Sequence, residues 1–478
     1  MKKDISNQHF IGPIAYRLAM LLLALVCMNA CGTSSQPAKP GNERPNIIFI
    51  LADDLGYGEL GAYGQQVIQT PNIDRLAREG KKFTNFYAGG PVCGPSRACL
   101  MTGLHQGHGF IKDNPGGKPE KETLRPRDLV FPEKLKEVGY YNACIGKWGL
   151  GPKGSTGYPL EKGFDYFVGY DTHVAAHNYY PAKLCSNEGW MELEPGTYSH
   201  NVFTQEALDF LKKDHHSPFF LYLAYTIPHS PHNPPSMWPY EQKDWPERAK
   251  KYAAMITLMD TDIGKIIAAL GEHGHGKNTM VIFTSDNGAD VQVGKLTREW
   301  HDLFNNNGGL RSGKRSVYDG GIRVPFIAWW PGYIGPGTVD EILAFQDIMP
   351  TMMEMAGLKD PVKTSGISIA PLLFDTGDEF DGHRMLYWEF IWQGRSGGGQ
   401  QAALDTRTGY KAVRFGSKGE PKLYNIFEDP AESMRIYGSQ EKQRMALQDY
   451  LDTVRTSSEF WPMPEYGWFQ RTPWEPLD

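Results

Sequence analysis

Short apolar runs alternate with amphipathic stretches along most of this chain. Residues 45–52, 219–225 and 280–283 are nearly continuous apolar runs, as expected for parallel strands that are buried on both faces. Residues 70–80 and 131–139 instead carry apolar side chains at helical spacing, and each stretch ends at a glycine. This alternation predicts an α/β fold with a large, mostly parallel sheet that is covered by helices on both faces.

The pattern changes after about residue 383. Segments 385–390, 409–414 and 422–425 are typical of short strands in an antiparallel meander. We therefore expect a large N-terminal domain over residues 45–375 and a small C-terminal antiparallel-sheet subdomain over residues 383–478. Residues 32–44 contain Pro and Gly and are expected to form a linker before the first strand.

The N-terminus is typical of a targeting segment. Lys2, Lys3 and Arg17 precede the apolar residues 18–28, a run too short for a comfortable transmembrane helix. The segment resembles a bacterial lipoprotein signal, with Cys31 as the lipidated first residue of the mature chain. An ordinary secretion signal with an incidental cysteine is the alternative. Residues 1–31 thus predict an exported protein that a lipid anchor holds in the periplasm or at the outer membrane.

Composition narrows the possible functions. The 478 residues are 40% hydrophobic and 22% charged, which is ordinary for a globular protein, and the net charge of -6 argues against a general nucleic-acid binder. It does not argue against an anionic substrate, because the local charge of a pocket decides that. Beyond Cys31 and Cys93, the mature chain holds Cys99, Cys144 and Cys185, an odd count that does not suggest a disulfide framework.

Acidic and amide side chains follow two of the predicted strands. Asp53 and Asp54 end the run at 45–52, and Asp286 and Asn287 follow the run at 280–283. The carboxyl ends of parallel strands share one edge of a sheet, so these side chains are expected to meet there. Oxygen ligands suit a hard cation, and Ca²⁺ tolerates irregular carboxylate-rich sites better than Mg²⁺ does. Any single one of these residues is explained equally well as a helix cap or a turn residue.

Residues 93–97, Cys-Gly-Pro-Ser-Arg, lead into a predicted helix. Proline suits the first turn of a helix, so Cys93 would lie at the helix N-terminus, where anions are stabilised. Arg97, four residues later, would add a positive charge on the same face. The arrangement suits a nucleophile that attacks an anionic group, although a buried cysteine before an ordinary helix explains the pentapeptide alone.

Together these motifs resemble the type I sulfatases, the arylsulfatase-like branch of the alkaline phosphatase superfamily. The resemblance extends from residue 45 to about residue 432 and includes residues 146–148 (Gly-Lys-Trp), 285–288 (Ser-Asp-Asn-Gly) and 320–325 (Gly-Gly-Ile-Arg-Val-Pro). It implies an alkaline phosphatase-like fold. It also implies that a formylglycine-generating maturation enzyme oxidises Cys93 to formylglycine (3-oxoalanine), whose hydrate is the nucleophile.

The resemblance assigns roles to further residues. Arg97 would hold the formylglycine hydroxyl, and Lys147 and Lys314 would bind sulfate. His229 would face the leaving oxygen as a proton donor. The Ca²⁺ ligands that it implies are Asp53, Asp54, Cys93 in its matured form, Asp286 and Asn287. Each lysine or histidine taken alone is explained as well by a solvated charge or a loop hydrogen bond.

One position departs from the family pattern. Many members have His after Gly-Lys-Trp, where this chain has Gly149. The histidine at that position contacts a formylglycine hydroxyl and is often assigned as the base of the second reaction step. His173 and His177 are the candidates to replace it.

The same two histidines are the expected substrate contacts, with His177 the first choice. They lie in a region of polar and aromatic residues that suits sugar rings, and this favours a sulfated carbohydrate as substrate. Packing of the two domains against each other explains the aromatic residues equally well. Two other functions stay open: a phosphoester or phosphonate ester hydrolase on the same scaffold, and a noncatalytic, lipid-anchored glycan-binding protein.

Overall fold

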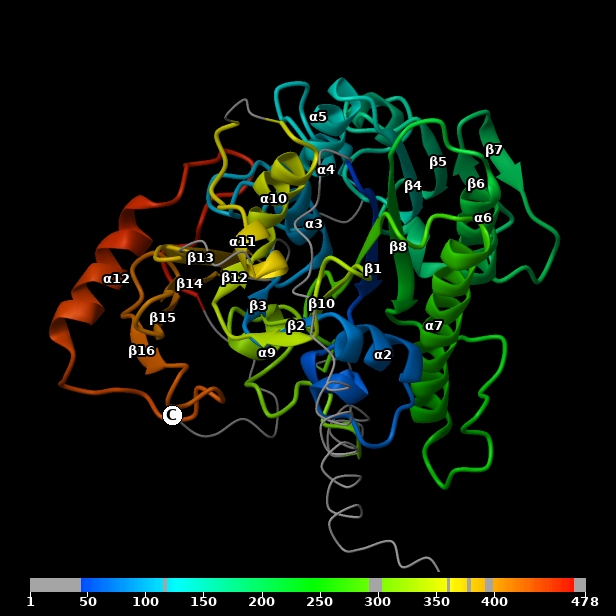
Figure 1. The fold of residues 1–478 in the computed structure, drawn as a ribbon. Helices are drawn as coiled ribbons and strands as arrows, with labels where there is room; N and C mark the ends of the chain where they lie inside the picture. Colours follow the sequence, from blue (N-terminus) through cyan, green and yellow to red (C-terminus); the bar gives the residue numbers. More distant parts are fainter. Residues whose placement is uncertain are drawn as a thin grey trace, which may run out of the picture. The chain divides into compact units, whose positions relative to one another are not determined.

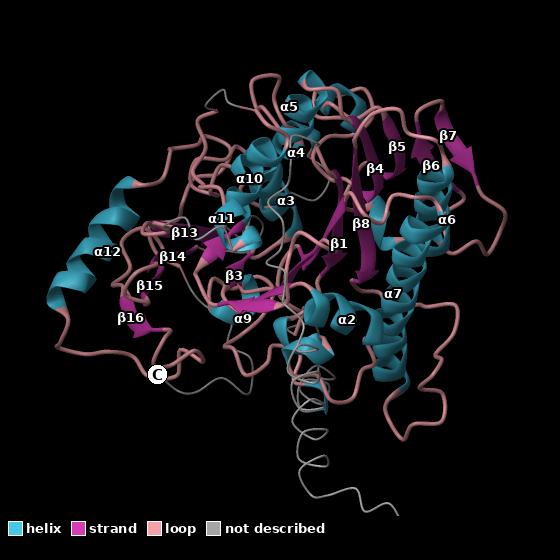
Figure 2. Ribbon diagram, viewed as in Figure 1, coloured by secondary structure: helices cyan, strands magenta, loops and turns pink. Residues whose placement is uncertain are grey.

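A mixed sheet forms the centre of the protein (Figures 1 and 2). The computed structural model describes residues 44–114, 118–291, 303–358, 362–375, 380–391 and 399–467. Within these residues the sheet has ten strands. In spatial order they are β11 (Gly337–Val339), β2 (Lys81–Phe83), β10 (Phe326–Trp329), β9 (Thr279–Ser285), β1 (Asn46–Asp53), β8 (Phe219–Pro228), β4 (Tyr141–Lys147), β5 (Tyr166–Tyr170), β6 (Lys183–Ser186) and β7 (Gly189–Glu192).

The five middle strands are parallel. β1 pairs in parallel with both β8 and β9, and β4 pairs in parallel with β8 and β5. The antiparallel pairs lie toward the edges, where β10 pairs with β9 and β2, β6 with β5, and β7 with β6. The prediction of a mostly parallel sheet is confirmed, and the runs at 45–52, 219–225 and 280–283 are its three central strands.

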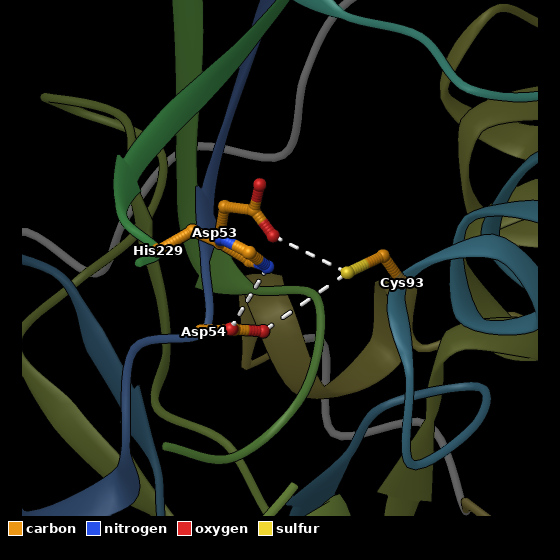
Figure 3. A group of neighbouring side chains, drawn as sticks. All are labelled: Asp53, Asp54, Cys93 and His229. Atoms are coloured by element: carbon orange, nitrogen blue, oxygen red, sulfur yellow. Dashed lines mark hydrogen bonds and ion pairs between the residues drawn. The ribbon is translucent and has the colours of Figure 1, made fainter. Parts of the chain in front are cut away.

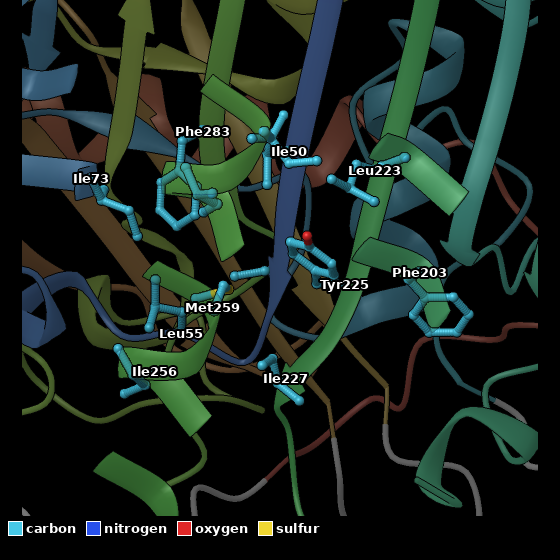
Figure 4. Close-up of a cluster of buried hydrophobic side chains, with 14 of the residues drawn as sticks. Ile50, Leu55, Ile73, Phe203, Leu223, Tyr225, Ile227, Ile256, Met259 and Phe283 are labelled. Carbon is cyan, nitrogen blue, oxygen red and sulfur yellow. The ribbon is translucent and has the colours of Figure 1, made fainter. Parts of the chain in front are cut away.

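Helices cover both faces of this sheet because its central strands are apolar on both sides. In β1, Ile48 and Ile50 pack into one hydrophobic cluster and Ile47 and Phe49 into the other, as the two-residue repeat of a strand requires. The first cluster includes side chains from α2, α6 and α7 (Figure 4). The second includes side chains from α3, α5 and α10.

The helices agree with the amphipathic stretches that the sequence indicates. The stretch at 70–80 forms α2 and the stretch at 131–139 forms α5. The described α-helices are α2 (Pro71–Glu79), α3 (Cys93–Thr102), α4 (Pro119–Glu122), α5 (Phe131–Glu137), α6 (Ser199–Lys212), α7 (Glu247–Glu272), α9 (Asp319–Ile322), α10 (Ile348–Met355), α11 (Ala370–Phe374) and α12 (Glu441–Thr453). Short 3-10 helices are η1 (Tyr57–Glu59), η2 (Gly61–Tyr63), η3 (Pro159–Lys162), η4 (Ala175–His177) and η5 (Phe345–Asp347).

Two smaller sheets complete the fold. β3 (Phe86–Tyr87) pairs in parallel with β12 (Leu343–Ala344). Near the C-terminus an antiparallel meander follows the chain order β13 (Met385–Phe390), β14 (Gln400–Asp405), β15 (Tyr410–Phe415) and β16 (Lys422–Asn425). The predicted small antiparallel sheet is confirmed, whereas the exact domain boundaries at 375 and 383 stay predictions.

A buried ion-pair network joins this meander to the larger part of the fold. Lys411 of β15 lies 2.7 Å from Asp319 of α9 and 2.9 Å from Glu432, and all three side chains are fully buried. Trp388 of β13 also donates a hydrogen bond to the Ala88 carbonyl. The meander therefore shares buried polar contacts with the region that precedes α3.

Replacing Lys411 with methionine should destabilise the protein by about 3 kcal/mol, because two buried carboxylates would lose their shared cation. Denaturant unfolding would measure the change. Lys418→Met is the matched control, since the Lys418–Glu465 pair is exposed and should contribute less than about 1 kcal/mol. Equal effects of the two substitutions would contradict a structural role for the buried network.

Several expectations concern residues 1–43, which lie outside the described residues. The signal segment, the linker and the lipidation of Cys31 therefore stay predictions. In the part of the chain that the structure describes, no helix combines the length and the apolar character needed to cross a membrane. Cys93, Cys99, Cys144 and Cys185 are all buried with free thiols, in agreement with the expectation that they form no disulfide framework.

Candidate active site

The five parallel strands bring their following residues to one edge of the sheet (Figure 1). The strands are neighbours in the order β9, β1, β8, β4 and β5, so their carboxyl ends lie side by side. The residues at these ends are Asp286 and Asn287 after β9, Asp53 and Asp54 at the end of β1, His229 after β8, Lys147 at the end of β4 and His173 after β5. Residues from the ends of five strands thus meet at one edge, and they include Asp53, Asp54, Asp286 and Asn287, whose meeting the sequence predicted.

Cys93 faces the pair of aspartates at the end of β1 (Figure 3). Its Sγ atom lies 3.3 Å from Oδ1 of Asp53 and 4.0 Å from Oδ1 of Asp54. Nε2 of His229 lies 3.4 Å from Oδ2 of Asp54. One ligand atom from each of these four residues falls within 4.8 Å of the others, which is a spacing that a single metal ion can bridge.

Asp286 and Asn287 close the other side of this group. Oδ1 of Asp286 accepts a hydrogen bond from the Asp54 amide at 3.1 Å, and Nδ2 of Asn287 donates to Oδ1 of Asp54 at 2.8 Å. Oδ1 of Asn287 is buried and has no hydrogen-bond partner among the described residues. A buried acceptor without a partner is costly unless something else satisfies it, and a cation would do so. The residues therefore fit a hard metal ion.

Three cationic side chains surround the three carboxylates. Lys147 Nζ lies 2.7 Å from Asp53, Lys314 Nζ lies 2.6 Å from Asp54, and Arg97 donates two hydrogen bonds to Oδ2 of Asp286. The six charges balance before any metal binds. A divalent cation would make the pocket positive, as the binding of an anionic substrate requires.

The charges act differently on the individual carboxyl groups. Burial by itself would raise the pKa of Asp54, but the Lys314 ammonium and His229 hold it well below its usual range. Burial raises the pKa of Asp286, and the neighbouring Asp53 carboxylate adds to that effect. Asp54 also has a left-handed backbone, with φ of 66°, which Asp and Asn tolerate better than most residues.

The Cys93 thiol differs from the sequence-based expectation. Cys93 begins helix α3, and Val92 precedes it as the N-cap, so its place at the helix N-terminus is confirmed. Burial nevertheless raises the pKa of the thiol, and the carboxylates of Asp286 and Asp53 raise it further. Burial and nearby acids outweigh the helix dipole, so the unmodified side chain is a neutral thiol rather than a stabilised anion.

The imidazole rings of His229 and His177 stack on each other. Their ring centroids are 4.3 Å apart and the rings are nearly parallel, at 13°. Nδ1 of His229 hydrogen bonds with the Ser230 carbonyl, which leaves Nε2 facing Asp54. Burial and the Lys314 ammonium hold the pKa of His229 well below its usual range. A bound anion would raise that pKa, so the role of His229 as a proton donor stays a prediction that needs a substrate.

Sequence reasoning did not identify several residues near the site. Oδ1 of Asn114 accepts the Gly94 amide at 2.7 Å and so satisfies a free donor in the first turn of α3. Beside Asp54 lies a small pocket, lined among others by His232, Arg248 and Tyr252. His232 follows the Pro228-His229 motif closely enough for the sequence to suggest it. Arg248 and Tyr252 come from the start of α7, and no local sequence signal connects them to the site.

Comparisons with known proteins agree with this geometry. A family model described as Sulfatase matches residues 45–358, and a second, described as N-sulphoglucosamine sulphohydrolase, C-terminal, matches residues 311–457. N-acetylgalactosamine-6-sulfatase of Rattus norvegicus is 35% identical over 385 residues, which cover 73% of this chain and 68% of that protein. Arylsulfatase A of Homo sapiens is 30% identical over 453 residues, which cover 82% of this chain and 83% of that protein.

Solved structures extend the agreement to the fold. The crystal structure of Ps i-CgsB in complex with k-i-k-neocarrahexaose matches with a TM-score of 0.76 and 27% identity, over 88% of this chain and 95% of that chain. The first family model alone spans more than half of the present chain. That span includes the described site and the motifs that suggested the resemblance. The protein therefore belongs to the sulfatase family and is a sulfuric ester hydrolase.

Proposed function

We propose that this enzyme hydrolyses a sulfate ester of a sulfated carbohydrate, with Cys93 matured to formylglycine and with Ca²⁺ as the metal. The observation that carries the proposal is the position of Cys93. Its Sγ faces the carboxylates of Asp53 and Asp54, which would help to hold a cation, and three buried cationic side chains pair with the carboxylates of the site. The thiol occupies the place of the hydroxyl oxygen of the matured residue.

The donor set supports Ca²⁺ as the proposed metal. Asp53, Asp54 and Asp286 offer carboxylate oxygens, and Asn287 offers the buried amide oxygen that lacks a partner. With the matured residue 93 as a further oxygen ligand, the set is hard and irregular, which Ca²⁺ accommodates. When bound, Ca²⁺ supplies Lewis-acid stabilisation of negative charge. Hydrated formylglycine supplies a hydroxyl nucleophile, and release of sulfate returns the residue to its aldehyde form.

The surrounding side chains then have distinct proposed tasks. Lys147 and Lys314 are fully buried with their ammonium groups at the carboxylates, where they would bind sulfuryl oxygens. Arg97 is held by Asp286 and by the Lys147 carbonyl, so its guanidinium is fixed where it would orient residue 93. His229 is placed to give a proton to the leaving oxygen.

A carbohydrate substrate is supported by the nature of the relatives and by the exposed side of the site. The names of two matched proteins refer to an amino sugar and to a neocarrahexaose. His177 is exposed and stacks on His229, so it would meet the substrate outside the metal group. It is the proposed specificity contact, and His173 lies deeper in the same region.

The test is to produce the protein together with a formylglycine-generating enzyme and to determine the mass of the tryptic peptide Phe83–Arg97. We expect loss of sulfur and gain of an aldehyde oxygen at residue 93, with hydrolysis of sulfated sugars that depends on this change. Parallel assays with phosphate diesters and phosphonate esters would detect the other chemistry of this scaffold. Full maturation with glycan binding but no turnover of any ester would refute the hydrolase proposal in favour of a binding protein.

A further inference from the structure

The imidazole of His173 lies against Gly149, in the space where a side chain at position 149 would stand. Gly149 lies two residues after β4 and has a left-handed backbone, with φ of 76°. A Cβ atom at this position would lie 2.3 Å from Cε1 of His173, 2.6 Å from Nε2 and 2.7 Å from Nδ1. No side chain can stand at position 149 while His173 keeps its place. The imidazole of His173 therefore fills the volume into which a residue 149 side chain would project.

The same imidazole reaches the first turn of α3. Its Nε2 lies 3.2 Å from the point where a Cβ on Gly94 would stand, and Gly94 follows Cys93 directly. Burial, together with the charges of Lys147 and Arg97, holds the pKa of His173 well below its usual range, so the imidazole is neutral and can accept a proton. His173 is thus placed beside the residue that follows Cys93, whereas the ring of His177 stacks on His229.

His173 also has an unsatisfied polar atom. The side chain is 6% exposed, and its Nδ1 has no hydrogen-bond partner within the described part of the chain. Burying an unpaired nitrogen costs about 1 to 3 kcal/mol, so an imidazole kept only for packing would be replaced at little loss by an apolar side chain. An unpaired nitrogen on a buried imidazole beside a reacting residue therefore calls for a role other than packing, and proton transfer is a role that an imidazole can supply.

We propose that His173 replaces the histidine that the family pattern places at position 149 and that its Nε2 accepts a proton from matured residue 93. This inference rests on the proposed function. The proton moves from a hydroxyl of residue 93 to Nε2, and the O–H electron pair forms the carbonyl bond. Sulfate departs with the electrons of its bond to carbon. Water later takes the proton from the imidazolium, and addition of water to the carbonyl restores the hydrate.

The test uses the matured full-length enzyme with His173→Ala. We expect kcat to fall by about 10²- to 10⁴-fold with a much smaller change in KM, because a proton acceptor is lost rather than a binding group. Mass spectrometry of the peptide Phe83–Arg97 during turnover should show sulfate retained on residue 93. Added imidazole should enter the vacated space, restore part of kcat and remove the retained sulfate.

Two further variants separate proton transfer from packing. His173→Gln keeps most of the volume, so a packing role predicts nearly normal kcat, whereas the proposal predicts a loss without rescue by imidazole. His105→Ala is the matched control, since His105 is equally buried but contacts Tyr387 and His108 instead of the site. It should neither retain sulfate nor respond to imidazole.

The outcomes distinguish this inference from the proposed function. If the matured wild-type enzyme hydrolyses no sulfate ester, the proposed function fails. If the wild type is active while His173→Ala or His173→Gln stays within about threefold of it, only the inference is overturned. Retained sulfate in His173→Ala that imidazole removes would establish the assignment.

Discussion

Cys93→Ala should abolish sulfate ester hydrolysis, with a loss in kcat on the order of 10⁶-fold. Removing the nucleophile of an enzyme that uses covalent catalysis costs about this much. The carboxylates and cations of the described site are arranged around the Sγ position, so alanine leaves them without the group on which they act. Steady-state kinetics on a substrate of the wild type, with the mass of peptide 83–97, would measure the loss and its cause.

Cys99→Ala is the control for this prediction. Cys99 lies on the same helix and is equally buried, but its thiol faces the Gly89 carbonyl at 3.3 Å rather than the carboxylates. Both substitutions remove one sulfur atom from a packed interior, so both should lower stability by a similar amount, about 1 kcal/mol. Cys99→Ala should keep maturation and activity. Activity of Cys93→Ala, produced together with the maturation enzyme as the wild type is, would rule out residue 93 as the nucleophile.

The central strands were predictable because each carries its own signal. Buried parallel strands need apolar residues on both faces. β1 lies within one residue of its expected limits and β9 within two. β14 was not predicted, because Gln400 and Gln401 make its start polar. Gln401 is nevertheless buried, where it hydrogen bonds with Tyr387 and Arg414. Such a strand is stabilised by partners that are distant in sequence, which local patterns do not show.

The same distinction between local signals and long-range contacts applies to the residues of the site. Asp53, Asp54, Asp286 and Asn287 could be assigned from strand ends, since parallel topology alone brings those ends together. The contact between Gly149 and His173 could not be assigned in this way. The His173 imidazole fills the space beside Gly149, and the sequence does not show which loops pack against each other. The neutral state of the Cys93 thiol also could not be predicted from the sequence. The helix N-terminus is visible in the motif, but the burial and the facing carboxylates are not.

Asp54→Asn should lower kcat/KM by about 10⁴-fold and abolish stabilisation of the protein by Ca²⁺. The metal contributes several kcal/mol to the transition state, and each 1.4 kcal/mol changes a rate by about tenfold. Asparagine keeps the shape of the side chain and tolerates the left-handed backbone at this position. It removes the negative charge that faces Cys93, His229 and Lys314.

Thermal unfolding with a chelator and with added Ca²⁺ would measure the binding part of this prediction. A ligand at about 100 times its Kd stabilises the folded state by about 2.7 kcal/mol, so the wild type should unfold at a clearly higher temperature with Ca²⁺. Asp54→Asn should show no such increase. Its metal-free form should also unfold at a lower temperature than the metal-free wild type, because the buried Lys314 ammonium would lose its partner carboxylate.

Asp262→Asn separates loss of a metal ligand from loss of a buried charge. Asp262 is a buried carboxylate whose partners are His200, Thr204 and Lys265, none of which belongs to the site. Its replacement should lower the stability of the protein in chelator and leave the increase with Ca²⁺ intact. A normal Ca²⁺ response in Asp54→Asn would exclude Asp54 as a ligand. If Mg²⁺ but not Ca²⁺ raised the unfolding temperature of the wild type, the site would stand as a metal site, but its metal would be Mg²⁺. Both ions bind oxygen donors, and Mg²⁺ requires a more regular coordination geometry.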